Sequence, residues 1–128
     1  MTQIRQEIET TVGFIKGRNA IHLDKVVQEE NILIFHGEFS APLCSNYSGK
    51  GRWLGYEFKF SEVRIYKCWE LDLYPDEKKI ISSFDVVKPC MWNSDLDESK
   101  LNYYVLSTYD YIYEIIAKDY VLALVSER

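Results

Sequence analysis

Hydrophobic positions in the first part of the chain recur every four residues. Ile4, Ile8 and Val12 are spaced in this way, and polar residues fill the positions between them. Side chains at i, i+4 and i+8 lie on one face of an α-helix, and Thr2 is a candidate N-cap. The pattern predicts one amphipathic N-terminal helix over about residues 3–15, with its apolar stripe packed on a sheet.

From about residue 20 onward the period changes from four to two. Tyr56, Phe58 and Phe60 alternate with Glu57 and Lys59, as the two faces of a half-buried strand do. Similar alternation, or short β-rich runs bounded by polar turns, continues along the rest of the chain. The predicted strands are 21–27, 32–39, 53–60, 63–73, 80–87, 103–109, 111–117 and 120–125.

The last part of the chain, residues 110–125, also fits a helix. Tyr111, Ile115 and the pair Asp119-Tyr120 are spaced about four residues apart. Strands are favoured there because Ile, Val and Tyr prefer extended backbone, and because Lys118-Asp119 is a plausible two-residue turn.

The order of these elements predicts an α+β fold, in which one N-terminal helix precedes a mainly antiparallel, meandering β-sheet over about residues 20–125. The sheet is expected to curl into a roll, a sandwich or a half-barrel. With 128 residues the chain has the usual length of one domain, so residues 1–128 are interpreted as a single domain. A doubly wound α/β fold is disfavoured because helical segments do not alternate with the strands.

The net negative charge belongs to the second half of the chain. Residues 1–64 contain eight basic and eight acidic residues, residues 65–128 contain seven basic and twelve acidic ones, and the net charge is −5. An acidic surface repels phosphate backbones and attracts cationic groups. Nucleic acid is therefore not expected as a partner, whereas a basic protein is.

A cytoplasmic location without membrane contact is expected. The chain has no run of about 20 apolar residues, and its N-terminus is polar where a signal peptide would be apolar. Cys44, Cys68 and Cys90 are separated by 24 and 22 residues, spacings that match no zinc or redox motif. They are interpreted as reduced thiols, and neither a metal nor another cofactor is predicted.

Two histidines provide the candidate cluster for acid–base chemistry. A hairpin turn around residue 29 would pair positions whose numbers sum to about 58, and His22 would then lie directly opposite His36. Asp24 would add a carboxylate on the same sheet face. This cluster supports an alternative function, a small-ligand-binding or hydrolytic site. Because the chain shows no recognised motif for nucleophilic catalysis, no catalytic residue is assigned and an enzyme is not predicted.

Aromatic residues make up 15% of the chain, including ten Tyr and three Trp. Large amphipathic rings are favoured at protein interfaces, although they also fill the cores of small curved sheets. Together with the acidic second half, they predict a non-enzymatic protein-binding domain. An open meander also leaves unpaired strands, so a homo-oligomer joined through sheet edges is a further alternative. The candidate binding residues are Trp69, Glu70, Asp72, Tyr103, Tyr109, Tyr111 and Tyr113.

Three segments of the second half, KCWELD at 67–72, YYVLSTYD at 103–110 and EII at 114–116, resemble small uncharacterised bacterial proteins. Some of those proteins look like immunity proteins of contact-dependent or polymorphic toxin systems. The resemblance implies a cytoplasmic α+β protein that neutralises a partner by binding it. It assigns no catalytic residue.

Overall fold

The structure is a computed structural model that describes residues 4–47, 49, 51–75, 80–88 and 101–127. Within these residues the chain forms nine β-strands and two single-turn 3-10 helices. The strands are β1 (Ile4–Glu7), β2 (Ile21–Glu29), β3 (Ile32–Ser40), β4 (Trp53–Ser61), β5 (Ile65–Glu70), β6 (Phe84–Lys88), β7 (Asn102–Ser107), β8 (Tyr111–Ala117) and β9 (Asp119–Glu127), and the 3-10 helices are η1 (Ala41–Leu43) and η2 (Leu71–Leu73).

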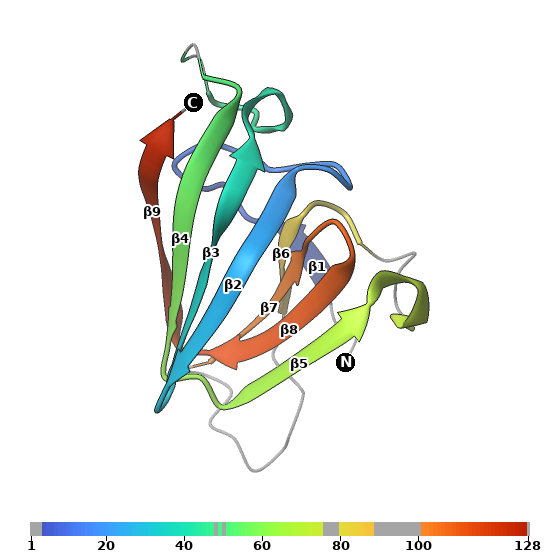
Figure 1. The fold of residues 1–128 in the computed structure, drawn as a ribbon. Helices are drawn as coiled ribbons and strands as arrows, with labels where there is room; N and C mark the ends of the chain where they lie inside the picture. Colours follow the sequence, from blue (N-terminus) through green and yellow to red (C-terminus); the bar gives the residue numbers. More distant parts are fainter. Residues whose placement is uncertain (1–3, 48, 50, 76–79, 89–100, 128) are drawn as a thin grey trace.

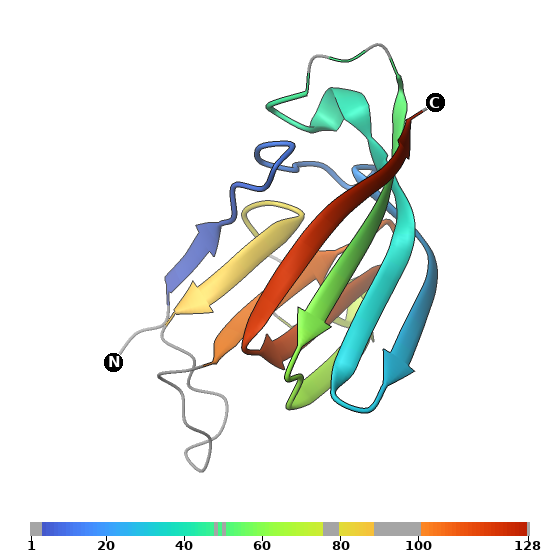
Figure 2. The ribbon, with the colours of Figure 1, turned by 90° about the vertical axis from the view of Figure 1, so that its left-hand side faces the viewer.

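The strands form two antiparallel sheets that face each other (Figures 1 and 2). One sheet has the strand order β1-β6-β7-β8-β5, and the other has the order β2-β3-β4-β9. The antiparallel pairing predicted from the period of two is therefore confirmed. The prediction of one meandering sheet is wrong, because the strands form two sheets and distant segments such as β1 and β6 are neighbours in one of them. No helix in the described part of the chain has the length and apolar character needed to cross a membrane.

The prediction of an α+β fold with an N-terminal helix is wrong, because the segment predicted to be helical contains β1. This strand pairs with β6 from Ile4 opposite Lys88 to Glu7 opposite Asp85. A spacing of four is also an even number, so Ile4 and Ile8 fit one face of a strand as well as one face of a helix. A helix of about three turns is marginal by itself, whereas β1 gains backbone hydrogen bonds from a sheet that is already formed.

Two chain segments bend from one sheet into the other. The β4–β5 segment and the β8–β9 segment run antiparallel across both sheets, with Phe60 opposite Tyr120 on one side of the bend and Ile65 opposite Ile116 on the other. At the bend, the amide of Lys118 donates to the carbonyl of Ser61 over 3.0 Å. The prediction of strands over 110–125 is thus confirmed, but Lys118 marks a corner between sheets and not the predicted hairpin turn.

The register of the β2–β3 hairpin differs from the one predicted. Glu30 takes a positive φ of 53°, and a tight turn over Glu30 and Asn31 places Glu29 opposite Ile32. A β-bulge between Leu23 and Lys25 then shifts the pairing by one residue. As a result, the strand partner of His22 is Glu38 and the strand partner of His36 is Lys25.

Gly37 on β3 lies under this bulge. A Cβ atom at Gly37 would lie only 1.9 Å from the backbone oxygen of His22. The hydroxyl of Tyr56, on β4, donates a hydrogen bond to that same oxygen over 3.1 Å. The absence of a side chain at Gly37 therefore gives the bulged backbone of β2 the room to enter the core and reach Tyr56.

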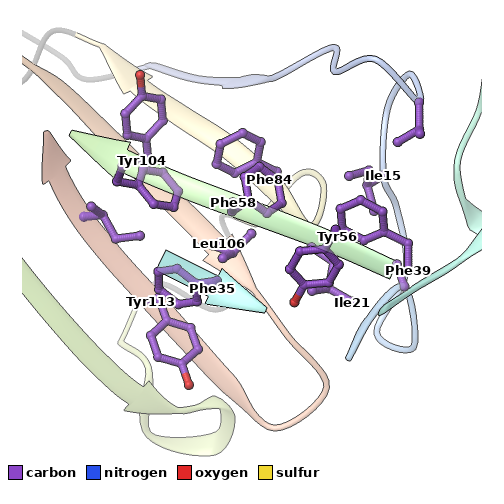
Figure 3. Close-up of a cluster of buried hydrophobic side chains, with 14 of the residues drawn as sticks. Ile15, Ile21, Phe35, Phe39, Tyr56, Phe58, Phe84, Tyr104, Leu106 and Tyr113 are labelled. Carbon is purple, nitrogen blue, oxygen red and sulfur yellow. The ribbon is translucent and has the colours of Figure 1, made fainter. Parts of the chain in front are cut away.

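The core between the sheets consists largely of aromatic rings, shown in Figure 3. Phe58 has its ring centre 4.8 Å from that of Phe84 on the opposite sheet. Phe35 and Tyr113 also meet across the two layers, with their centres 5.0 Å apart. Such offset or edge-on ring pairs add to the free energy gained from burial alone. Much of the aromatic excess in the sequence is therefore used to fill the space between two curved sheets.

Candidate functional site

Exposed acidic and aromatic residues gather at one end of the five-stranded sheet. The antiparallel pairing of β5 with β8 places Glu70, the last residue of β5, opposite Tyr111, the first residue of β8. The turn between β7 and β8, with Tyr109 and Asp110, lies beside η2, which follows β5 directly. Segments about 40 residues apart in sequence are thus adjacent at this end.

Hydrogen bonds hold the β7–β8 turn from three sides. Within the turn, the hydroxyl and the amide of Thr108 both donate to the carbonyl of Tyr111. The amide of Leu71 donates to the carbonyl of Asp110 over 2.9 Å, and the amide of Tyr109 donates to the carbonyl of Ile21 over 3.2 Å. The turn is therefore a fixed platform, and its side chains need little ordering when a partner binds.

An acidic pocket of about 210 Å³ lies between the turn and η2. Its lining contains three carboxylates and one guanidinium, that of Arg18. The Nε of Arg18 donates to the carbonyl of Tyr109 over 3.3 Å, and its guanidinium carbon lies 4.9 Å from the centre of the Tyr109 ring. The net charge of the lining is negative, so the pocket favours a cationic group. The lining residues are Arg18, Glu70, Leu71, Asp72, Asp110 and Tyr111.

A row of rings extends from this pocket towards the four-stranded sheet. Tyr109 stacks on His22 with 6.1 Å between ring centres and 16° between ring planes. His22 in turn meets Trp53 edge-on at 5.2 Å. Tyr109, Tyr111 and Trp53 are among the exposed large hydrophobic residues of the protein. We call the acidic pocket together with Tyr109, His22 and Trp53 the turn surface.

The structure brings together four of the seven binding residues predicted from the sequence. Glu70, Asp72 and Tyr111 line the acidic pocket, and Tyr109 forms its border with the row of rings. The other three, Trp69, Tyr103 and Tyr113, do not belong to the turn surface. Tyr113 lies in the core between the sheets, and the Trp69 and Tyr103 rings are packed on the opposite face of the five-stranded sheet.

On that opposite face, Trp69 and Tyr103 surround the buried carboxylate of Glu114. The indole Nε1 of Trp69 donates to Glu114 over 2.6 Å, and the hydroxyl of Tyr103 donates to the other carboxylate oxygen. Burial, together with the hydrogen bond to Glu114, raises the pKa of Tyr103 above its ordinary value. Lys67 places its ammonium nitrogen 5.6 Å from the centre of the Trp69 ring. The arrangement gives both oxygens of the buried Glu114 side chain a hydrogen-bond donor and fixes two rings, which indicates a structural role.

Replacing Glu114 by leucine tests this role. Leucine fills a similar volume, and an apolar replacement for a buried charge is often neutral. Here, however, it leaves the indole N–H of Trp69 and the hydroxyl of Tyr103 without an acceptor. We expect the free energy of unfolding to fall by about 2 kcal/mol in urea denaturation. The double variant Glu114→Leu/Tyr103→Phe should recover part of this loss, and a neutral single variant would contradict the assignment.

The histidines of the alternative function are not paired across the hairpin. His22 and His36 both lie on the outer face of the four-stranded sheet, opposite Glu38 and Lys25 respectively, and Asp24 falls in the β-bulge. The ring of His22 instead meets Tyr109 and Trp53. In the part of the chain that the structure describes, no three His, Cys, Asp or Glu side chains gather in a group that could hold a metal ion.

The described cysteines are free thiols. Burial raises the pKa of the Cys44 thiol to about 11, which is opposite to the lowered pKa that a nucleophilic thiolate needs. Cys68 is exposed on β5. Cys90, like Trp92 in the aromatic series, lies outside the described residues.

A second cavity, of about 370 Å³, adjoins the acidic pocket and shares Arg18 and Leu71 with it. Its wall combines aliphatic side chains with serine and threonine hydroxyls. The buried carboxylate of Asp85 accepts hydrogen bonds from the amides of Ile81 and Ser82 and so fixes the segment that forms one side. The lining residues are Gly17, Arg18, Leu71, Ile80, Ile81, Ser82, Ser83, Ser107, Thr108 and Ile112.

Apart from His22, which was predicted only for the alternative cluster, the turn surface contains four residues that were not among the candidates predicted from the sequence, namely Arg18, Leu71, Asp110 and Trp53. Arg18 lies between Gly17 and Asn19, in a stretch whose sequence indicates only that a secondary-structure element ends there. No pattern in the neighbouring residues predicts a contact between Arg18 and Tyr109. Asp110 is an acidic residue in a turn, and Trp53 is an aromatic residue in a strand. Neither position differs from many others in the sequence. Their proximity depends on the packing of the two sheets. Comparison with known proteins adds no constraint, since no protein-family model, curated protein or solved structure matches the chain.

Proposed function

We propose that this protein is a non-enzymatic binding domain that holds a basic protein partner on the turn surface. The observation that carries the proposal is the acidic pocket, where the carboxylates of Glu70 and Asp72 lie beside a fixed turn that adds the carboxylate of Asp110 and exposed tyrosine rings. A lysine or arginine side chain of a partner would donate charge-assisted hydrogen bonds to the carboxylates of Glu70, Asp72 and Asp110. The rings of Tyr109 and Tyr111 would add apolar area and cation–π contacts around that anchor.

The class of partner that we favour is a bacterial toxin, which an immunity-type inhibitor would neutralise by covering a basic surface. The support for this choice is the resemblance of the second half of the chain to immunity proteins and the excess of acidic residues there. Electrostatic attraction of this kind accelerates association and weakens as salt is added.

An NMR titration with a short arginine-containing peptide tests the binding of basic groups. We expect amide shifts to concentrate at 70–72 and 109–111, and the triple variant Glu70→Gln/Asp72→Asn/Asp110→Asn to weaken the peptide affinity at least about tenfold. The matched control neutralises three exposed carboxylates elsewhere, in Glu9→Gln/Asp24→Asn/Glu29→Gln, and should retain the affinity of the wild type. Equal weakening in both triple variants would show attraction by net charge alone and would contradict the proposed site.

Capture from lysate of the source organism provides the second test. A partner of the turn surface should be retained by the wild type and the control variant and lost from Tyr109→Ala/Tyr111→Ala. Because both rings are exposed, this double variant is expected to remain folded. If the double variant captured a partner as efficiently as the wild type does, the binding surface would lie elsewhere on the protein.

A further inference from the structure

Strand β9 is a long edge strand. It spans nine residues, Asp119–Glu127, and stands at the end of the four-stranded sheet, where β4 is its partner on one side. Among the described strands none pairs with its other side. Such an edge presents a row of backbone N–H and C=O groups to a further strand.

Edge strands usually carry charged residues that prevent pairing with another chain, and the central part of β9 lacks them. From Tyr120 to Val125 the strand carries no charged residue, and Val121, Leu124 and Val125 are 62%, 43% and 60% exposed. The other edge strands differ in this respect. Strand β2 has Asp24 and Lys25 near its centre, β1 spans four residues, and β5 has an exposed lysine at its centre. A β-bulge interrupts the pairing of both β2 and β9, at Asp24 in β2 and at Val125 in β9, so the difference between these two edges is the absence of charge from the middle of β9. An apolar, uncharged edge is the kind that pairs with another chain.

The sequence of β9 is complementary to itself. Residues 121–125 read Val-Leu-Ala-Leu-Val in both directions. In an antiparallel pair centred on Ala123, Val121 of one copy lies opposite Val125 of the other, and Leu122 lies opposite Leu124. Apolar cross-strand pairs of this kind stabilise a sheet.

This register also matches the two faces of the sheet. Leu122 and Leu124 lie opposite Phe58 and Tyr56 of β4, whose side chains point into the core, while Ala123 lies opposite Glu57 on the outer face. A shift by one residue would join the core face of one copy to the outer face of the other. A shift by two residues would place an acidic residue from one end of β9 opposite a valine. The register centred on Ala123 avoids both defects, although it places Asp119 of each copy opposite Glu127 of the other at the two ends of the strand.

We propose that two copies of this chain pair through β9, antiparallel about a two-fold axis at Ala123, and join their four-stranded sheets into one continuous sheet. A two-fold contact of this type is closed, so it yields dimers and not filaments. Figures 1 and 2 place β9 on the side of the molecule opposite to β5, which leads into the turn surface. The acidic pockets of both copies therefore remain accessible in the dimer.

The substitution Ala123→Lys tests the dimer at its axis. In one copy the introduced ammonium group lies on the outer face beside Glu57, a favourable cross-strand pair, so the monomer should fold. In the dimer the two ammonium groups meet at the two-fold axis. We expect sedimentation equilibrium to show a dimer for the wild type and a dissociation constant at least about 100-fold higher for the variant. Gln28→Lys, which adds the same charge to exposed β2, should remain dimeric.

A charge-complementation experiment separates the proposed register from a general effect of charge. Ala123→Glu alone should also be monomeric, and mixing it with Ala123→Lys should restore a heterodimer because opposite charges then meet at the axis. Circular dichroism confirms that each variant is folded. A wild type that remains monomeric up to about 1 mM, a dimer that Ala123→Lys leaves intact, or a mixture that stays monomeric overturns the proposal.

Discussion

Raising the pH above about 10 is expected to unfold the protein cooperatively. Burial raises the pKa of Tyr56, Tyr103, Tyr104 and Tyr113 above the ordinary tyrosine value in the folded state. In the unfolded chain these phenols ionise near pH 10, so their contribution to stability is complete below that pH and is lost as the pH rises towards the folded values. With four such groups, the free energy of unfolding falls by about 5 kcal/mol per pH unit.

Over two pH units this loss amounts to about 10 kcal/mol, which is comparable to the whole stability of a usual domain, about 5–15 kcal/mol. Far-ultraviolet circular dichroism and the absorbance of tyrosinate should therefore change together between about pH 10.5 and 12. The variant Tyr104→Phe removes one buried phenol and should make the pH dependence less steep. Gradual ionisation of all the tyrosines near pH 10, with the circular dichroism unchanged, would contradict the assignment of these rings to the core.

The substitution Gly37→Ala is expected to lower the free energy of unfolding by about 3 kcal/mol or more. An added Cβ would meet the backbone oxygen of His22 at 1.9 Å and the hydroxyl of Tyr56 at 2.7 Å. The first obstacle is backbone in a paired strand and cannot rotate away, so β2 and β3 must separate. Tyr56 then also loses its hydrogen bond to His22. Urea denaturation measures the change in the free energy of unfolding.

Gly55→Ala is the matched control for this experiment. Gly55 lies on β4, and a Cβ there would approach the Ser126 hydroxyl at 2.1 Å, an atom of an exposed side chain that can change rotamer. We expect a loss of no more than about 1 kcal/mol. Both glycines lie opposite a β-bulge, so the two substitutions differ in the obstacle that the new Cβ meets, which is backbone at Gly37 and a side-chain hydroxyl at Gly55. Equal destabilisation by both substitutions would show that the fixed backbone oxygen of His22 does not determine the loss.

The bulge also connects the fold with the turn surface. It follows His22, whose ring lies between Tyr109 and Trp53. Gly37→Ala is therefore expected to disturb the row of rings as well as the hairpin. Glu114 lies on the other face of the five-stranded sheet. Glu114→Leu is therefore expected to lower the free energy of unfolding without disturbing these ring contacts.

Part of the candidate site was predicted from the sequence, and the positions of its residues explain which part. Glu70, Asp72, Tyr109 and Tyr111 lie at a strand end and in a turn, where polar and aromatic side chains are exposed by local geometry. Tyr103 and Tyr113 also have aromatic and acidic residues near them in the sequence, yet both are buried. They lie on opposite faces of the same sheet, and both faces are covered. The alternation along a strand separates the two faces, but it does not reveal that the other sheet covers one face and that side chains of flanking segments, such as Tyr74 and Ile80, pack on the other.

By itself, the sequence determined that most of the chain is extended and antiparallel and that the second half is acidic, and it favoured strands over a helix for 110–125. These properties depend on neighbouring residues, because side chains alternate every two positions along a strand and turn residues act locally. Only the tertiary structure decided that β1 is a strand, that the β2–β3 register places His22 opposite Glu38, and that Arg18 reaches Tyr109. Each of these outcomes depends on hydrogen bonds or packing between elements, and several join residues more than 80 positions apart, a separation that no local period encodes.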